Sequence, residues 1–527
     1  MDLRNTPVLV VGAGIMGAGI AQVAAQAGHA VKLYDTRAGA AAEAKAKLAA
    51  TLEGLVAKGR LEAAAAAAAV ARIVPVSALG EAADAQLVVE AVVEKLDVKR
   101  GLFRELEGIV APSCVLATNT SSISVTAIAN GLAHPGRLAG MHFFNPVPLM
   151  KLVEVVSGLQ TDAGVAAAIF ELAKAWGKVP VHAKSTPGFI VNRIARPYYA
   201  EALALLLERA AEPAALDACL KAAGFRMGPC ELMDLIGHDT NFAVTQSVYE
   251  ANFFDKRYQP SLVQREMVDG GLLGRKSGRG FYRYGGGAGG GGAGDGAAGA
   301  PAADTAAPAA PPGAHEVTVH GDGPIAELLE AAATQALAGH GWGPARDRGS
   351  AWTGLRIDGA RLMLSDGRTA QQVAAAMAVA DVALFDRPLV LPPPPGTALA
   401  FAVAPQAGDA WRAQVPGWLA ALGFTPVPLA DSPGLVVTRT VAMLVNEAAD
   451  AVLQGVCTPA GADAAMKLGV AYPAGPFEWL ARWSPGGAAA GGGAAAVIGV
   501  LEALDAHYRG ERYRVSPWLR RQQAAAQ

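Results

Sequence analysis

The chain has 527 residues, of which 52% are hydrophobic, and its formal net charge at pH 7 is −2. This length is enough for three or four domains, and the balance of charge gives no reason to expect nucleic acid as a partner. Much of the hydrophobic content is alanine, and no run of about 18 strongly apolar residues occurs, so we expect no membrane span.

The N-terminus and the cysteines indicate the compartment. A strand begins within the first ten residues, which leaves no room for a signal peptide. The four cysteines lack metal-binding or redox spacing, so we expect reduced thiols, no bound metal and a cytoplasmic protein. They are Cys114, Cys219, Cys230 and Cys457.

The first elements have the spacing of a βαβ unit. Val8–Val11 is a short apolar run typical of a buried strand, and Gly12–Gly17 follows it at once with glycines at its first, third and sixth positions. Ala18–Ala27 is predicted to be a helix, and a second strand, Ala30–Tyr34, ends at Asp35. Strand, glycine turn, helix, strand and acid in this order predict a dinucleotide site.

Each residue of this unit has an expected part in binding. Gly12 permits the tight turn, Gly14 lets a pyrophosphate approach the backbone, and Gly17 lets the helix pack against the strand. The helix N-terminus attracts the phosphate charge. Asp35 would bind ribose hydroxyls and so favours NAD over NADP. Because Arg37 is close in the sequence and could bind a 2′-phosphate, NADP remains an alternative cofactor. The alternative is a glycine turn that serves packing alone.

Strands and helices continue to alternate up to about residue 184. A helical region, Ala38–Ala71, is followed by predicted strands at Ile73–Val76, Gln86–Ala91 and Cys114–Thr118. Repeated βαβ units predict a mostly parallel, doubly wound sheet with helices on both faces. We therefore expect an α/β Rossmann-type domain over residues 1–184.

The last part of this domain contains a predicted hairpin. Two apolar strands, Leu138–Phe144 and Lys151–Val156, flank a turn rich in Asn and Pro. Folding back about residue 148 in antiparallel register would bring His142 opposite Glu154. An imidazole held by a carboxylate can act as a general base near neutral pH. A buried histidine that merely bonds a convenient acid is the competing interpretation.

The character of the sequence changes after the hairpin. Thr186-Pro187-Gly188 is predicted to start a helix, with Thr186 as the cap, and helical patterns continue to about residue 270. We expect an all-α domain over residues 185–284. Residues 285–314 are almost entirely Gly, Ala and Pro, a composition typical of a flexible linker.

A second, degenerate Rossmann-like domain is predicted over residues 315–430. The strand Glu316–His320 precedes Gly321–Ala326, which has alanine at the third glycine position and Pro324 within the turn. For this reason we expect one NAD per chain. Further strands are predicted at Val382–Phe385, Leu389–Leu391 and Ala398–Val403.

Residues 431–527 repeat the helical domain. Three segments recur in the same order: Thr186–Arg193 as Ser432–Arg439, Glu201 as Glu447, and Met227–Glu231 as Ala474–Glu478. Asn192 of the first copy is Thr438 in the second. A chemical role kept only in the first copy, or drift on a surface helix, would account for the difference.

Five motifs together resemble the L-3-hydroxyacyl-CoA dehydrogenases, in their long bacterial form with two C-terminal helical domains. The motifs are Gly12–Gly17, Val89–Glu94, Asn119–Ser122, Gly140–Glu154 and Thr186–Arg193. The resemblance covers nearly the whole chain except the linker. It implies NAD-dependent oxidation of the 3-hydroxyl of an acyl-CoA thioester, with 3-hydroxyadipyl and 3-hydroxybutyryl thioesters as the expected substrates.

The resemblance also implies roles for residues. His142 matches the family's base, Glu154 its carboxylate partner, Ser121 the serine that bonds the substrate 3-oxygen, and Asn192 an asparagine that helps to hold the substrate. Cofactor contacts are implied for Gly12, Gly14, Ile15, Met16, Gly17, Asp35, Glu94, Lys99, Asn119, Ser121, Asn145 and Lys276. Contacts with CoA or the substrate are implied for Thr51, Lys58 and Ser121.

Other interpretations remain open. Glu94 and Lys99 could form an ordinary surface pair, and Lys58 could be a solvated helix residue. The substrate could be a free hydroxy or sugar acid, and a non-catalytic dinucleotide-binding scaffold is the third reading. The second helical domain would either build a homodimer or act as a dimer partner within one chain. Arg196, Arg226 and Arg257 are candidates to meet a distal substrate carboxylate.

Overall fold

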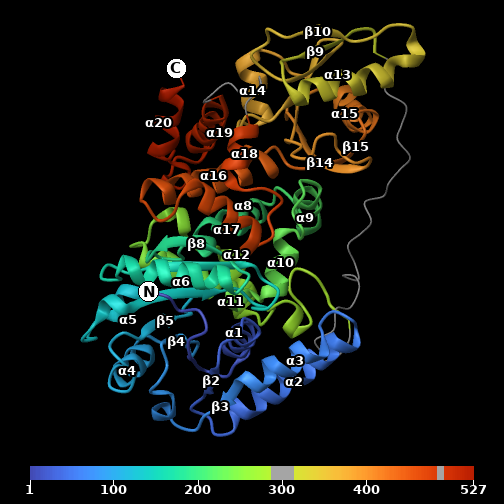
Figure 1. The fold of residues 1–527 in the computed structure, drawn as a ribbon. Helices are drawn as coiled ribbons and strands as arrows, with labels where there is room; N and C mark the ends of the chain where they lie inside the picture. Colours follow the sequence, from blue (N-terminus) through green and yellow to red (C-terminus); the bar gives the residue numbers. More distant parts are fainter. Residues whose placement is uncertain (286–313, 484–491, 527) are drawn as a thin grey trace. The chain divides into compact units, whose positions relative to one another are not determined.

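The protein is described here by a computed structural model that covers residues 1–285, 314–483 and 492–526. The chain divides into two compact units (Figure 1). Unit 1 consists of Met1–Arg193 and Gln454–Val470, and unit 2 of Ile194–Leu453 and Ala471–Gln527. The predicted linker, 285–314, lies almost wholly outside the described residues.

Among the described residues, unit 1 is built on an eight-stranded sheet in the order β3-β2-β1-β4-β5-β6-β7-β8. Neighbouring strands are parallel except β6 and β7, which are antiparallel. The prediction of a mostly parallel α/β sheet is therefore confirmed. The strands are β1 Val8–Val11, β2 Val31–Tyr34, β3 Ile73–Pro75, β4 Leu87–Glu90, β5 Val115–Thr118, β6 Leu138–Phe143, β7 Leu152–Ser157 and β8 Val179–Lys184.

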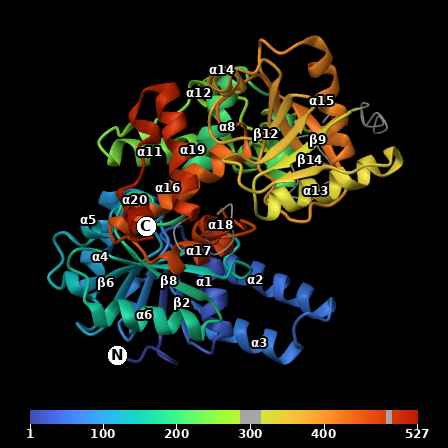
Figure 2. The same cartoon turned by 90° about the horizontal axis from the view of Figure 1, so that it is seen from above.

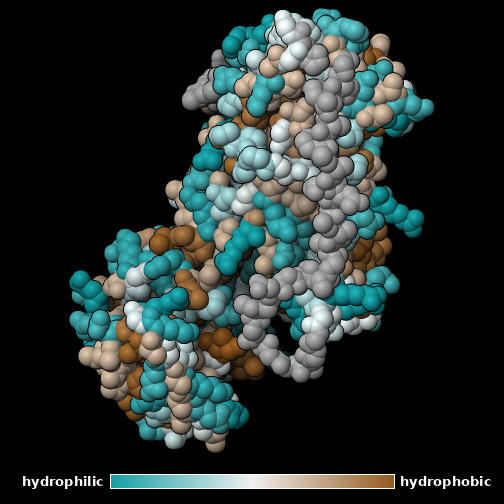
Figure 3. All heavy atoms as spheres, turned by 90° about the vertical axis from the view of Figure 1, so that its right-hand side faces the viewer, coloured by the Kyte–Doolittle hydropathy of each residue, from teal (hydrophilic) through white to brown (hydrophobic). Residues whose placement is uncertain are grey.

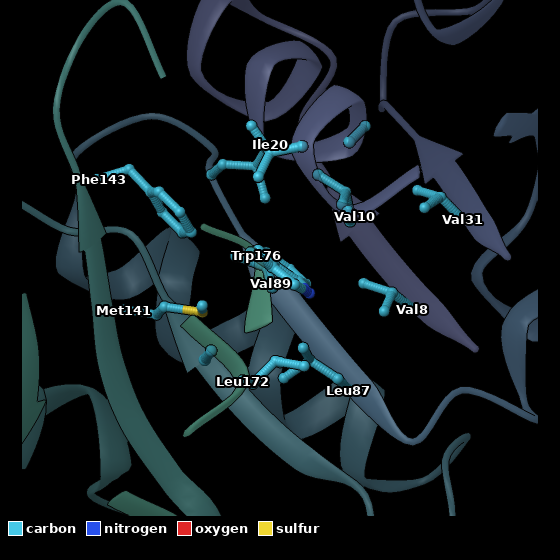
Figure 4. Close-up of a cluster of buried hydrophobic side chains, with 14 of the residues drawn as sticks. Val8, Val10, Ile20, Val31, Leu87, Val89, Met141, Phe143, Leu172 and Trp176 are labelled. Carbon is cyan, nitrogen blue, oxygen red and sulfur yellow. The ribbon is translucent and has the colours of Figure 1, made fainter. Parts of the chain in front are cut away.

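The central strands of unit 1 are mostly apolar and buried because helices cover the sheet. β1 and β5 are buried at every position, as is typical of parallel strands. Figure 4 shows Ile20 of α1 and Trp176, which follows α6, among the valines of the sheet. The helices are α1 Ile15–Gln26, α2 Ala40–Ala57, α3 Ala63–Arg72, α4 Leu96–Glu107, α5 Val125–Ala129, α6 Ala163–Ala175, α7 Val191–Ile194 and α17 Pro459–Gly469.

Two of these helices lie side by side as a helical hairpin. α2 and α3 occupy the region where the sequence predicted helix, and they pack against each other (Figure 2). Three alanines and two leucines of α2, together with two alanines of α3, are buried. Small side chains let the two helices approach closely, which explains the alanine-rich composition of this segment.

Helix α17 comes from the second helical repeat but folds as part of unit 1. It packs on β7 and β8, and the amide of Lys184 donates to the carbonyl of Val456 just before it. A Cβ on Gly469 would stand 2.8 Å from the Leu152 side chain, so glycine permits this close approach. The sequence repeat did not indicate this exchange.

The predicted helix start at Thr186 is wrong. Residues 186–189 form a turn in which Gly188 has φ 75° and Phe189 has φ 47°, and helix α7 begins only at Val191. The Thr186 hydroxyl donates to the Lys184 carbonyl instead of capping a helix. The left-handed backbone at two successive residues rules out a helix there.

The described part of unit 2 contains a seven-stranded mixed sheet in the order β10-β9-β11-β12-β13-β14-β15. The predicted strand Leu389–Leu391 is wrong, because these residues form an irregular segment among prolines. Pro324 does not disturb the glycine turn but occupies the first position of α13. The strands are β9 Val317–His320, β10 Ala345–Asp347, β11 Gly354–Ile357, β12 Ala360–Leu364, β13 Val382–Phe385, β14 Thr397–Val403 and β15 Phe424–Pro428.

Helices make up the remainder of unit 2, and its longest buried helix is α16, at the centre of the second repeat. From the first repeat come α8 Arg196–Leu207, α9 Pro213–Ala222, α10 Pro229–Ile236, α11 His238–Ala251 and α12 Leu262–Asp269. The others are α13 Pro324–Leu337, α14 Ala370–Met377, α15 Asp409–Ala421, α16 Val437–Leu453, α18 Pro476–Arg482, α19 Gly492–Tyr508 and α20 Pro517–Ala525.

The two helical repeats contact each other through buried charged side chains within unit 2. Glu201 of the first repeat is fully buried and accepts hydrogen bonds from Arg439, Arg512 and Tyr513 of the second. Its pKa is lowered because these two guanidinium groups outweigh the effect of burial. A carboxylate with this many charged donors is stable in the protein interior.

The reverse contact has the same composition. Glu447 of the second repeat, which corresponds to Glu201, accepts from Arg257 at 3.3 Å and from Tyr258 at 2.6 Å, both of the first repeat. Arg257 also pairs with Asp450. Since each repeat presents an Arg-Tyr pair to the glutamate of the other, the contact has the reciprocity of a twofold dimer interface.

No helix among the described residues is long and apolar enough to cross a membrane. On the face drawn in Figure 3, hydrophilic residues lie among apolar ones.

Candidate active site

The hairpin of β6 and β7 pairs His142 with Glu154 across the two strands, so the predicted register is confirmed. Nδ1 of His142 lies 2.6 Å from Oε2 of Glu154, and both residues are buried. Since an ionised carboxylate only accepts, Nδ1 carries the proton, and Nε2 is the basic nitrogen. The pair therefore has the geometry of an oriented general base.

A second contact holds the carboxylate of Glu154. Its Oε1 accepts from the amides of Ile190 and Val191, each at 3.0 Å. The turn at Phe189 leaves these two amides free to donate to a side chain. The sequence analysis had predicted a helix at this turn. One carboxylate thus connects the imidazole to the start of α7, and aromatic rings of Phe144 and Phe189 lie 4.6 and 5.8 Å from the imidazole.

Glu94 organises the segment that carries Ser121. Its Oε1 accepts from the Thr120 hydroxyl at 2.6 Å and from the amides of Ser121 and Ser122 at 2.9 and 3.1 Å. Burial raises the pKa of Glu94, but the charge of Lys99 and the hydrogen bonds from Thr120 and Ser121 outweigh it, so the pKa is lowered. Glu94 therefore stays ionised and fixes the serine turn.

Lys99 is not a surface residue, because its side chain is only 1% exposed. Its ammonium group lies 2.6 Å from Glu90 and 3.1 Å from Glu94. Glu90 also accepts from the Thr118 hydroxyl at 2.6 Å. This buried network at the ends of β4 and β5 excludes the ordinary surface pair as an interpretation. Sequence reasoning missed Glu90 and Thr118, although Thr118 ends one predicted strand and Glu90 is the last residue but one of another.

Three asparagines have different positions. Asn119 accepts from the Phe143 amide at 2.8 Å and so ties the end of β5 to β6. The amide of Asn192 donates to the Ser121 carbonyl at 3.3 Å, which brings two of the predicted site residues together. Asn145 is exposed in the turn after β6.

The glycine turn fits a dinucleotide. A Cβ on Gly17 would stand 1.7 Å from the carbonyl oxygen of Gly12, whereas a Cβ on Gly14 would meet nothing within 4 Å. Gly14 is the N-cap of α1, so an open surface faces the unpaired amides of that helix. Ile15 beside it is 79% exposed, and Met16 is half-buried. These residues would hold the pyrophosphate of NAD.

Asp35 ends β2 beside this turn. One carboxylate oxygen accepts from the Ala13 amide at 2.7 Å and the other from the Arg37 amide at 2.9 Å. The Arg37 guanidinium forms two hydrogen bonds to Glu43, at 3.0 and 2.7 Å. In this arrangement Arg37 already has a carboxylate partner.

A cavity of about 380 Å³ lies between the glycine turn and α2. Thr51 is one of its lining residues, together with Gly14, Ile15 and Lys47. Lys58 is the C-cap of α2 and does not line it. Lys276, in unit 2, pairs with Asp239 of α11. The described residues contain no cluster of side chains suited to hold a metal ion.

In the second copy, a carboxylate from a different strand binds the corresponding amides. Asp386 follows β13, which takes the place of β6 in the second sheet. It accepts from the amides of Val436 and Val437, which correspond to the amides bound by Glu154. Its amide bonds to Ala400 on the neighbouring strand, so the residue across from the acid is an alanine. This copy therefore lacks the histidine–glutamate arrangement.

Comparison with known proteins shows the family of the chain. Residues 7–186 match the 3-hydroxyacyl-CoA dehydrogenase NAD binding domain, and residues 188–284 and 434–526 match the 3-hydroxyacyl-CoA dehydrogenase C-terminal domain. Residues 362–433 match the 3-hydroxybutyryl-CoA dehydrogenase reduced Rossmann-fold domain. The chain belongs to the 3-hydroxyacyl-CoA dehydrogenase family and is an NAD-dependent oxidoreductase.

Particular relatives extend over different parts of the chain. The 3-hydroxyadipyl-CoA dehydrogenase of Escherichia coli (strain K12) is 42% identical over 524 residues, 99% of this chain and 98% of the relative. The probable 3-hydroxybutyryl-CoA dehydrogenase of Deinococcus radiodurans is 44% identical over 52% of this chain and 99% of its own length. The crystal structure of 3-hydroxybutyryl-CoA dehydrogenase from Escherichia coli K12 has a TM-score of 0.83 and 39% identity, with 99% of both chains covered.

Proposed function

We propose that His142 is the general base in the NAD-dependent oxidation of the 3-hydroxyl of an L-3-hydroxyacyl-CoA to the 3-oxo group. The observation that carries this proposal is the buried 2.6 Å contact between His142 and Glu154, which leaves Nε2 as the basic nitrogen. Nε2 takes the hydroxyl proton, and Glu154 stabilises the imidazolium that forms. Bound NAD supplies the acceptor for the hydride that leaves C3.

Ser121 and Asn192 are proposed to hold the substrate. Ser121 follows β5 in a turn fixed by Glu94, so its hydroxyl keeps a constant position for a hydrogen bond to the 3-oxygen. The contact between Asn192 and the Ser121 carbonyl supports a shared role for these two residues. A preorganised donor of this kind stabilises charge on the reacting oxygen.

The CoA moiety is proposed to bind beside α2. Thr51 lines a cavity that also contains Gly14 and the cationic Lys47, which suits a phosphate-bearing ligand, whereas Arg37 in the same wall pairs with Glu43. Lys58 would contribute charge from the helix end without lining the cavity. Lys276 remains a proposed cofactor contact, as do Asn119 and Asn145.

We infer that the acyl group is 3-hydroxyadipyl or 3-hydroxybutyryl, the two groups named in the long relatives. Arg257 is a poor candidate for a distal carboxylate because Glu447 and Asp450 already pair with it. Arg196 bonds Thr245, and its guanidinium lies 4.9 Å from the Tyr199 ring. Arg226 is exposed.

The second helical repeat is proposed to serve as a dimer partner within one chain. The reciprocal contacts of Glu201 and Glu447 supply the support, because they form the kind of interface that two subunits would form. The domain limits 1–184, 185–284, 315–430 and 431–527 and a cytoplasmic location are parts of the same proposal.

The test is NADH formation at 340 nm with purified protein and NAD. Substrates are 3-hydroxybutyryl-CoA, 3-hydroxyadipyl-CoA and a free hydroxy acid. We expect strong turnover of a CoA ester, and the ratio of the two esters shows whether the pocket prefers a distal carboxylate. Turnover of the free acid alone would contradict the proposal and leave Thr51 and Lys58 without a CoA role.

A further inference from the structure

A cavity of about 460 Å³ lies in unit 2, at the carboxyl edge of the second sheet. It is formed by the turn after β9, the ends of β12 and β13, and helix α18. Its walls are mostly apolar and include the indoles of Trp479 and Trp483. The other lining residues are Asp322, Pro324, Ile325, Thr353, Leu364, Arg387, Pro388, Leu389, Leu391, Ala481 and Arg482.

Arg387 is an uncompensated cation in this wall. It is half-buried, its guanidinium lies 4.8 Å from the centre of the Trp483 ring, and its Nε is buried without a hydrogen-bond partner among the described residues. No ion pair joins it to any carboxylate of the described chain. Burial lowers its pKa to about 10, although Asp386 acts in the opposite direction. A half-buried guanidinium without a carboxylate bonded to it, in a mostly apolar wall, favours an anionic ligand.

A second donor in the same wall is also unused. Trp483 is 2% exposed, and its Nε1 is buried with no hydrogen-bond partner in the part of the chain that the structure describes. Buried indole N–H groups usually have a partner. Arg387 and Trp483 thus place two donors without partners in the wall of one cavity, and both of these atoms are shielded from solvent.

The turn at this cavity is poorly suited to a pyrophosphate. Pro324 occupies the first helical position and has no amide N–H to offer a phosphate. Asp322 on the turn adds a carboxylate, which lies 3.1 Å from Arg348. The position of the third glycine is taken by Ala326, which is fully buried. The cavity has therefore kept the location of a dinucleotide site but lost its phosphate chemistry.

We propose that this cavity binds a small organic acid, with its carboxylate on Arg387 and its apolar body against Trp479 and Trp483. The volume is within the range of small-molecule sites, and an apolar wall with few polar groups is the usual composition of such sites. The site is separate from the histidine–glutamate pair and does not depend on the dehydrogenase reaction.

Calorimetric titration of the full chain with 3-phenylpropionate and with its uncharged amide, 3-phenylpropanamide, tests the proposal. We expect one equivalent of acid to bind and the amide to bind at least about tenfold more weakly, a difference of about 1.4 kcal/mol. Arg387→Gln should lower the affinity for the acid to that for the amide. Arg520→Gln, at an exposed pair on α20, should change neither affinity. NADH formation should be the same in all three proteins.

Stability gives a second readout. Removing an unpaired cation should leave the thermal midpoint of Arg387→Gln at or above that of the parent. If that variant does not fold, Ile325→Trp, which fills the cavity, should exclude the acid.

The proposal is overturned by absence of binding at millimolar acid, by equal affinity for acid and amide, or by acid binding that survives Arg387→Gln or Ile325→Trp. Binding of AMP or inorganic phosphate that requires Arg387 would also overturn it, because the site would then recognise phosphate.

Discussion

At the scale of single residues, the geometry of His142 depends on contacts made by its partner. Glu154 uses one oxygen for the imidazole and the other for the amides of Ile190 and Val191. The imidazole cannot rotate without breaking the contact with a carboxylate that the backbone holds on its other side. This arrangement fixes the tautomer that a base requires.

Replacement of His142 should remove the base without removing the cofactor site. We expect His142→Gln to lower kcat by roughly 10²–10⁴-fold, the usual contribution of a positioned base, while NADH affinity measured by fluorescence stays unchanged. Glu154→Gln should also lower kcat. His182→Gln changes an exposed histidine that stacks on Phe170 and serves as the control. Turnover at the parental rate in His142→Gln would contradict the assignment.

The charge of Glu94 should make the stability of the serine turn depend on pH. Its pKa is lowered in the folded state, so its stabilisation is complete above the unfolded value of about 4.3 and is lost as pH falls through the folded value. We expect Glu94→Gln to lower the free energy of unfolding by roughly 1 kcal/mol at pH 7, since the side chain is 36% exposed, and to lower kcat/KM.

The measurement is the thermal midpoint of both proteins at pH 7 and pH 3. The difference should shrink at pH 3, because the contribution of a carboxylate with a lowered pKa is lost as the pH falls towards its folded value. Glu171→Gln, at an exposed pair with Lys174, should show no difference at either pH. A constant difference between parent and Glu94→Gln would mean that the charge is not responsible.

At the scale of elements, the two glycine turns show which positions serve packing and which serve binding. Gly17 faces the Gly12 carbonyl oxygen, while Gly14 faces open space. The second copy has kept glycine at the position of Gly14, as Gly323, and has Pro324 and Ala326 beyond it. The second copy therefore has the same strand-turn-helix element, although Pro324 in it lacks the amide that would bind a phosphate.

Two alanine substitutions should separate these roles. Gly17→Ala forces the backbone to move, since its Cβ would stand 1.7 Å from a carbonyl oxygen, and we expect lower thermal stability and lost NAD binding. Gly14→Ala meets no atom and has φ −67°, so the thermal midpoint should stay within about 1 °C of the parent while NAD affinity falls, because the methyl occupies the pyrophosphate surface. Equal losses of stability in both variants would contradict the distinction between a packing role for Gly17 and a binding role for Gly14.

At the scale of the whole molecule, the duplication explains why buried charges occur in pairs. Each repeat supplies one glutamate that accepts from arginine and tyrosine of the other, two arginines at Glu201 and one at Glu447. Removing one partner would leave guanidinium groups buried without a counter-charge. A stable in-chain interface of this kind leaves one chain as the expected unit in solution.

Glu201→Gln should therefore destabilise unit 2 strongly. We expect a loss of about 3–5 kcal/mol, because Arg439 and Arg512 lose their carboxylate. Urea unfolding measures the loss, and Glu208→Gln, at an exposed position beyond the end of the same helix, should cost far less. Light scattering of the parent should give the mass of one chain; a larger mass would contradict the in-chain partner but not the buried network.

Local patterns predicted the elements that carry the chemistry. The glycine spacing indicated β1, the turn and α1, because each glycine answers a local steric need. Two apolar strands and the turn rich in Asn and Pro between them predicted the pairing of His142 with Glu154, since folding back about residue 148 brings these two residues opposite each other. The roles of these residues in catalysis remain a prediction.

Only the tertiary structure decided how separate segments combine. The sequence alone determined the Rossmann unit, the histidine–glutamate hairpin and the helical repeat, because these depend on neighbouring residues. It could not show that the amides after the turn at Gly188 donate to Glu154. Nor could it show that Lys99 is buried between two carboxylates or that α17 folds as part of unit 1. Most of these contacts join residues far apart in the chain, and the contact of Lys99 with Glu90 and Glu94, although closer in sequence, depends on burial that no local pattern encodes.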